Sequence, residues 1–480
     1  MVIKILKMNN YKKFSILLAY LFFTSCKMLA PVEKVNKAAV PESYLVSKDS
    51  TNSAKIIWKD FFVDKNLNNL IDIGIKNNLE LQSTLQNIEI ARNNVKIRKG
   101  MFLPTVNAFA GTGIEKVGRF TSQGAGDASA EITPGQIVPE NLTDLAFGLS
   151  ASWEVDIWKK LRNSKKAAFT RYLGSIEGKN FVITNLVAEI ANSYYELLSL
   201  DNQLDIINET IVLQQNALEI VRLQKDAAKV SELAVKKFEA EVLNSQSLKF
   251  DVLQQITENE NNINFLLARF PQPIVRDKSA FNDQVPMPVK EGIPSQLLVN
   301  RPDIKAAELE LFATKCDVKV AQAEFYPSFT IAGGLGFRAF KPEYITSPES
   351  IFYNLLGDIT APLINRNAIK AEFNKAKSYQ IQAMFDYQKS ILNAYVEVSN
   401  QMSNIDNLGK LYDLKNKEVQ ALTNAISISN DLFRSARVDY FEVLMTQRDA
   451  ISSKLELIDA KKRQFNAVVD IYKALGGGWR

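Results

Sequence analysis

The stretch that decides the fold is Leu145-Ala-Phe-Gly-Leu-Ser-Ala-Ser-Trp-Glu-Val-Asp-Ile157. The odd positions are all apolar, and the even positions are small or acidic. Because successive side chains of a strand point to opposite faces, this alternation predicts a strand with one apolar face. Strands of soluble proteins average about 5–6 residues, whereas outer-membrane barrel strands run to about 10. Alone, the stretch fits either a soluble edge strand or a membrane strand.

Composition excludes several classes of function. The 480 residues are 46% hydrophobic and 23% charged, and they include two cysteines and no histidine. Histidine is the commonest general base and metal ligand, so the sequence predicts no enzyme, no metal site and no cofactor. No run of 18 apolar residues is present, so no transmembrane helix is expected apart from a signal segment.

The N-terminus resembles an export signal of the lipoprotein type. Lys12 and Lys13 precede the apolar run 14–23, and Thr24-Ser25-Cys26 follows it. This order predicts a signal peptide over 1–25 and lipidation of Cys26 after cleavage. A plain signal peptide with an incidental cysteine is the alternative, and the signal is already complete from Met8. Without the four lysines of residues 1–25, 54 basic residues face 53 acidic ones, so nothing favours nucleic acid as a partner.

The remainder divides into two similar halves. We predict a lipidated tail and equatorial segment over 26–65, a first repeat over 66–270, a proline-rich connector over 271–300 and a second repeat over 301–480. Each repeat should contain a helix (about 66–99 in the first), two strands and a long helical hairpin. The predicted strands are about 105–114, 145–157, 329–337 and 351–363. No proline occurs between Trp158 and Pro271, which favours a long hairpin with a break near 226–231.

The repeat is visible as matched segments. Val-Glu-Val-Ser-Asn at 396–400 matches Ala-Glu-Ile-Ala-Asn at 188–192, and the alternation of 145–157 returns at 351–363. Such self-similarity indicates one structural unit used twice. The chain therefore supplies four membrane strands, and an open sheet edge in lipid leaves costly unpaired backbone groups. Two copies would close eight strands and three copies twelve, and either number removes the open edges.

Several motifs on this repeat resemble the TolC-like outer-membrane efflux proteins, in the lipoprotein branch that serves tripartite pumps. The motifs are Cys26, Trp58 with Phe61, Phe62 and Asp64, Arg301-Pro-Asp-Ile304 with Ala307 and Glu308, Phe325-Tyr-Pro-Ser328, and Ala474-Leu-Gly-Gly-Gly-Trp479. The resemblance implies a mixed α and β membrane protein: a trimer whose twelve-stranded barrel is continued by a periplasmic helical barrel. It also implies a periplasmic adaptor and an inner-membrane transporter of the RND type as partners.

The same resemblance implies a periplasmic gate near the second hairpin turn. Asp439 and Glu442 match the acidic gate positions, and Arg437 matches the basic one. Three copies of one acid around an axis make a charge ring, which favours cations. The alternative is that these residues are solvated charges at a hairpin turn.

We therefore expect a lipid-anchored exit duct in the outer membrane of a Gram-negative bacterium, which passively conducts drugs or other small molecules. A type I protein-secretion duct and a periplasmic coiled-coil scaffold without a pore are the alternatives. The alternation also predicts lipid-facing barrel residues, which are Leu145, Phe147, Leu149, Trp153, Ile351, Tyr353, Leu355 and Ile359.

Overall fold

The computed structural model describes residues 41–44, 51–278, 281, 287–364, 366–435 and 437–480. The predicted signal peptide and Cys26 lie outside the described residues. Among the residues that are described, no helix combines the length and the apolar character needed to cross a membrane.

The described chain passes twice through one succession of elements. A 22-residue helix is followed by two long strands, a helix of 67 or 68 residues and a helix of 35 residues. The first succession is α4 (Leu79–Gly100), β1 (Thr105–Glu115), β4 (Leu142–Glu154), α6 (Lys160–Asp226) and α7 (Glu232–Leu266). The second is α10 (Pro302–Ala323), β5 (Ser328–Ala339), β6 (Ile351–Thr360), α11 (Asn367–Arg434) and α12 (Tyr440–Ala474).

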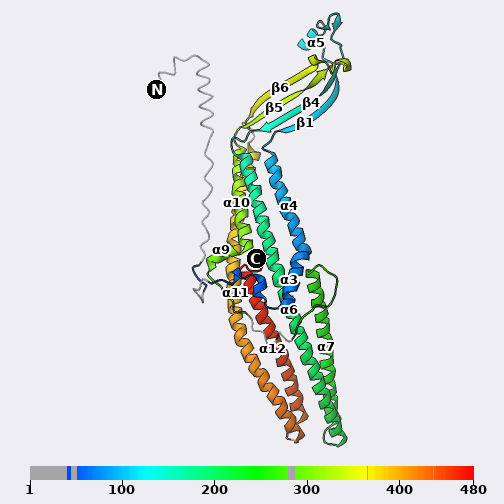
Figure 1. Ribbon diagram of the computed structural model, residues 1–480, viewed down its shortest axis with the longest axis vertical. Coiled ribbons are helices and arrows are strands. Elements are labelled where there is room, and N and C mark those ends of the chain that lie inside the picture. Colours follow the sequence, from blue (N-terminus) through cyan, green and yellow to red (C-terminus); the bar gives the residue numbers. More distant parts are fainter. Residues whose placement is uncertain (1–40, 45–50, 279–280, 282–286, 365, 436) are drawn as a thin grey trace. The chain divides into compact units, whose positions relative to one another are not determined.

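The four long strands form one antiparallel sheet in the order β1-β4-β5-β6. β1 and β6 are its edges and are paired on one side only in the described part of the chain. Figure 1 shows this sheet beyond one end of the long helices, with the hairpin turns of α6–α7 and α11–α12 at the other end. The mixed α and β class predicted from the sequence is therefore confirmed.

Helix α6 is the central element of the helical part. It packs against α4, α7, α10 and α12, and α11 packs against α10 and α12. The main hydrophobic core lies around the middle of α6, where Tyr194 and Leu197 are fully buried. Side chains of α7, α12, α2 (Trp58–Phe61) and α3 (Lys65–Asn77) complete this core. The apolar side chains of α6 thus pack against several elements at once.

The helix predicted over 66–99 is in fact two helices, α3 and α4, because Asn78 interrupts it. Asn78 has φ −51° and ψ 127°, and its Oδ1 accepts a hydrogen bond from the backbone N–H of Leu81 at 2.9 Å. Its Nδ2 donates to the carbonyl of Leu266 at 2.9 Å. Asn78 therefore caps α4 and fixes it to the end of α7.

The strand predicted over 145–157 is shifted towards its N-terminal side and ends at Glu154. Asp156 accepts hydrogen bonds from the backbone N–H groups of Leu161 and Arg162 at 2.9 and 3.0 Å. This acid satisfies the free amides at the start of α6, so the alternation past Glu154 does not belong to the strand. The loop predicted over 115–144 holds a short helix, α5 (Ser122–Asp127), and a hairpin of β2 (Glu131–Thr133) and β3 (Gln136–Ile137).

The end of α12 is joined to the start of the second succession. Arg301 is 6% exposed. Its Nη1 donates to the Glu397 carboxylate at 2.6 Å and to the Ala474 carbonyl at 2.8 Å. Its Nε and Nη2 donate to the Asp303 carboxylate. Trp479 donates its indole N–H to the carbonyls of Asn300 and Gly476. The Arg301-Pro-Asp-Ile304 and Ala474-to-Trp479 motifs are therefore two sides of one joint.

Aromatic packing extends this joint to the N-terminal segment. Tyr472 stacks on Phe61 with 3.9 Å between ring centroids, and its hydroxyl donates to the carbonyl of Ile56 at 2.6 Å. Burial raises the pKa of Tyr472 to about 12. The Tyr472 hydroxyl thus stays protonated at physiological pH and keeps its hydrogen bond to Ile56.

Candidate functional site

One face of the sheet collects the apolar alternating residues. In an antiparallel sheet, residues directly opposite one another share a face. The register aligns Phe147 with Phe337 and Ile351, and it aligns Leu149 with Leu335 and Tyr353. The structure places all eight predicted lipid-facing residues on this face, which we call the apolar face: Leu145, Phe147, Leu149, Trp153, Ile351, Tyr353, Leu355 and Ile359.

The apolar face is open to its surroundings. Tyr353, Leu355 and Ile359 are 83%, 78% and 73% exposed. A contiguous exposed apolar surface of this kind marks a contact with lipid or with another protein.

The opposite face, which we call the polar face, carries mainly small and hydrogen-bonding residues, and Phe109, Phe352 and Leu356 also lie on it. One of its rows aligns Asn107, Ser150, Gly334 and Asn354. Nearer the strand ends, Arg338 binds both carboxylate oxygens of Asp144 at 2.8 Å. The sheet is therefore apolar on one side and polar on the other, as the wall of a membrane barrel is.

Two tryptophans lie where the strands meet the helices. Trp153 donates its indole N–H to the carbonyl of Phe102 at 3.0 Å, and Trp158 donates to that of Pro327 at 2.6 Å. Trp158 also stacks on Tyr326 with 4.9 Å between centroids. Aromatic residues with a satisfied polar end are typical of a membrane–water boundary.

The two hairpin turns have matching backbone geometry. In the first turn the N–H of Lys229 donates to the carbonyl of Gln224, and in the second the N–H of Arg437 donates to that of Leu432, both at 2.9 Å. Both bonds reach back five residues, as in a Schellman motif at a helix C-terminus. Ala228 adopts φ 58° in the first turn.

The predicted gate residues lie together at the second turn. Asp439 precedes α12, and its Oδ1 accepts a hydrogen bond from the Tyr440 N–H at 2.6 Å. Glu442 lies in the first turn of α12, and Arg437 lies just before Asp439. All three side chains are exposed, and none forms an ion pair within the described residues. They are available to groups outside this chain.

The turn that carries these charges rests on a small apolar cluster. Val443 of α12 packs with Leu218 and Val221 of α6 and with Phe238 of α7. Lys237 of α7 lies over the ring of Phe441, 5.1 Å from its centroid. The two hairpin ends are therefore in contact, which fixes Arg437, Asp439 and Glu442 relative to the first hairpin.

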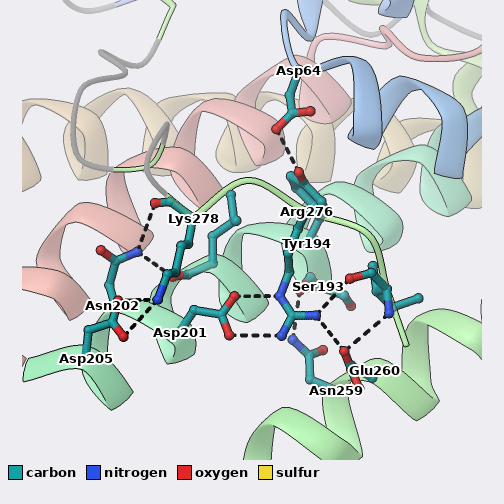
Figure 2. A network of polar contacts seen from close by, with 12 residues as sticks. Asp64, Ser193, Tyr194, Asp201, Asn202, Asp205, Asn259, Glu260, Arg276 and Lys278 are labelled. Atoms are coloured by element: carbon teal, nitrogen blue, oxygen red, sulfur yellow. Dashed lines mark hydrogen bonds and ion pairs between the residues drawn. The ribbon is translucent and has the colours of Figure 1, made fainter. Parts of the chain in front are cut away.

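A polar network that was not predicted from the sequence holds the connector to α6. Figure 2 shows Arg276 between Asp201 and Glu260. Its Nε and Nη2 donate to Asp201 at 2.5 and 2.9 Å, and its Nη1 donates to Glu260 at 2.5 Å. Lys278 binds Asp205 at 2.6 Å. Asp201 and Asp205 are four residues apart on α6, which is about 6 Å along a helix. Arg276 and Lys278 are two residues apart on an extended chain, which is about 6.6 Å. The two acids therefore have nearly the same spacing as the two cations. This matched spacing is the sequence feature from which the network could have been predicted.

Cys316 lies in the core beside Ala167 and Ala313 and is 4% exposed. Burial raises the pKa of its thiol. It is a packing residue, because a reactive cysteine needs an accessible thiolate.

Comparison with known proteins decides the family. A sequence model of the outer membrane efflux proteins matches residues 70–269 and 293–477. The chain belongs to this family. Its match includes both successions of helices and strands, and it confirms the family resemblance. As a family member the chain is an outer-membrane protein.

Curated relatives match over almost the whole length. A probable outer membrane lipoprotein, SilC of Salmonella typhimurium, is 25% identical over 95% of this chain and 96% of its own. The pyoverdine export outer membrane protein OpmQ of Pseudomonas aeruginosa is 26% identical over 98% of both chains.

Solved structures share the fold. A membrane protein from Pseudomonas aeruginosa superposes with a TM-score of 0.84 at 24% identity, over 94% of this chain and 100% of its own. The MtrE outer membrane channel of Neisseria gonorrhoeae, in its open state, gives 0.81 at 23% identity, over 95% and 99%.

Proposed function

We propose that this family member is the outer-membrane exit duct of a tripartite efflux system and that it passively conducts small molecules from the periplasm to the exterior. The observation that carries the proposal is the four-stranded sheet, which has one exposed apolar face, one polar face and two open edges. Such a sheet is unstable in lipid unless its edges are paired by other copies of the chain.

Three copies fit this role better than two. β1 and β6 run in opposite directions, since each strand is antiparallel to its neighbour in the sheet. The β6 edge of one copy can therefore add antiparallel to the β1 edge of the next. An eight-stranded barrel has an interior that side chains fill, whereas twelve strands leave a lumen. With the polar face inside, the long helices would continue the wall into the periplasm.

The gate belongs to the same proposal. Around a three-fold axis, Asp439 and Glu442 would form acidic rings, with Arg437 as the nearby basic partner. Their exposure and lack of ion pairs within the described chain support contacts between copies. Closure by such contacts needs little energy to reverse, since exposed ion pairs are worth about 0–1 kcal/mol each.

Anchoring and partners complete the proposal. We place a lipid on Cys26, outside the described residues, and we expect a periplasmic adaptor and an inner-membrane transporter of the RND type. Relatives named for cation efflux (CusC of Escherichia coli) and toluene efflux (TtgF of Pseudomonas putida) favour small cargo over type I protein secretion.

Conductance in planar bilayers tests the duct and the gate. We expect Asp439→Ala to raise the open-channel conductance severalfold, because it removes one acid from each ring contact. Asp449→Ala is the matched control, since Asp449 is an exposed acid of the same helix outside the turn. Equal conductance of both variants and the wild type would refute the proposed gate. An absence of conductance in all three proteins would refute the proposed duct function.

A further inference from the structure

An aromatic pair lies across the polar face of the sheet. The register aligns Phe109 of β1, Gly148 of β4, Gly336 of β5 and Phe352 of β6 in one row. Three strand spacings separate β1 from β6, about 14 Å in a flat sheet. The ring centroids of Phe109 and Phe352 are only 6.4 Å apart. The two rings therefore converge over the glycines, and the polar face is the concave one.

The glycines make this convergence possible. A Cβ on either Gly148 or Gly336 would come within 2.7 Å of the other residue's Cα, so no side chain fits between the two backbones. The rings meet at 46° rather than in a stack, and Phe109 is 37% exposed. Part of each ring surface is thus open on the concave side.

The surroundings of the pair are polar, and the two adjacent rows carry no unpaired charge within the described sheet. The adjacent row carries the amides of Asn107 and Asn354, with the Asn354 Oδ1 reaching over Gly334. In the row on the other side, Arg338 is neutralised by Asp144. Amides beside apolar rings favour a neutral ligand that combines an aromatic ring with hydrogen-bonding groups, because aromatic rings prefer tilted or offset contacts with one another.

We propose that Phe109 and Phe352, with Asn107 and Asn354, form a binding site on the duct wall for neutral aromatic molecules that carry hydrogen-bonding groups. The proposal rests on the duct function, in which the polar face lines the lumen. In the trimer the site would occur three times at one level, so passing aromatic cargo would meet a ring of such contacts. These residues would then influence which cargo crosses the barrel fastest.

Saturation-transfer NMR on the detergent-solubilised full-length protein tests the site, with chloramphenicol as the aromatic probe and maltose as the non-aromatic one. In Phe109→Ser/Phe352→Ser we expect the transfer to the nitrophenyl protons to fall about fivefold, as two lost aromatic contacts imply. Leu356→Ser is the control, because Leu356 is an exposed apolar residue of the same face two rows away. Phe352→Tyr should keep the wild-type signal.

The outcomes separate this proposal from the duct function. An equal signal from the double variant and the Leu356→Ser control would overturn the site, as would an equal loss with maltose. Bilayer conductance of the same preparations is measured in parallel. Normal conductance with no change in probe binding would refute the binding site and support the duct function. A specific loss of probe binding with no conductance in any sample would refute the duct function and support an aromatic binding site on the sheet.

Discussion

At the scale of single residues, two equivalent positions show how local space decides which residue a turn accepts. Ala268 and Gly476 both have positive φ, 53° and 88°. Each is followed by a residue whose N–H donates five residues back at 3.0 Å, Arg269 to Asn264 and Gly477 to Tyr472. A Cβ at Gly476 would lie 2.7 Å from the backbone of Asn300. The second turn therefore needs glycine for space as well as for conformation.

Opposite substitutions at these positions should differ strongly in the size of their effect. Gly476→Ala should lower the free energy of unfolding by about 2–4 kcal/mol, from left-handed strain of about 1–2 kcal/mol and the displaced backbone. Ala268→Gly relieves the strain and should change stability by less than about 1 kcal/mol. Denaturant unfolding followed by circular dichroism measures both. A Gly476→Ala protein as stable as the wild type would refute this account of the joint.

At the scale of elements, the strands test the division into an apolar and a polar face. Leu355 and Asn354 are neighbours on β6 and lie on opposite faces. Leu355→Arg should cost about 2–4 kcal/mol near the bilayer midplane, whereas Asn354→Arg should be tolerated. The yield of assembled oligomer on a mild-detergent gel measures the difference. Equal yields would mean that the apolar face does not contact lipid.

The sequence was sufficient for the strand faces and insufficient for the element ends. Alternation with a period of two assigns every residue of 145–154 to a face, because that pattern is local. The break at Asn78 combines a local cap on Leu81 with a bond to Leu266, 188 residues away, and only the cap is local in the sequence. The aromatic pair of Phe109 and Phe352 was likewise invisible, since it needs the register of three strand pairs.

The predicted gate residues illustrate the same limit. Resemblance placed Asp439, Glu442 and Arg437 near a turn, and the structure places them at one turn of exposed backbone. Their proposed partners belong to other copies of the chain, so neither the sequence nor one chain's geometry contains that contact.

At the scale of the whole molecule, the central claim is that β6 of one copy pairs with β1 of the next until three copies close. Cysteines on the apolar face of both edge strands report this pairing directly. Ala108→Cys is combined in turn with Tyr353→Cys, Leu355→Cys and Gly357→Cys, in a Cys316→Ala background that removes the buried thiol. Disulfide formation requires Cα atoms about 4.4–6.8 Å apart, so only the combination in register should react.

The measurement is the mass of the products on a denaturing, non-reducing gel after mild oxidation of the protein in its membrane. We predict that one combination gives a ladder of one, two and three chains that stops at three. Monomers from every combination, or a ladder that continues past three, would contradict the closed trimer.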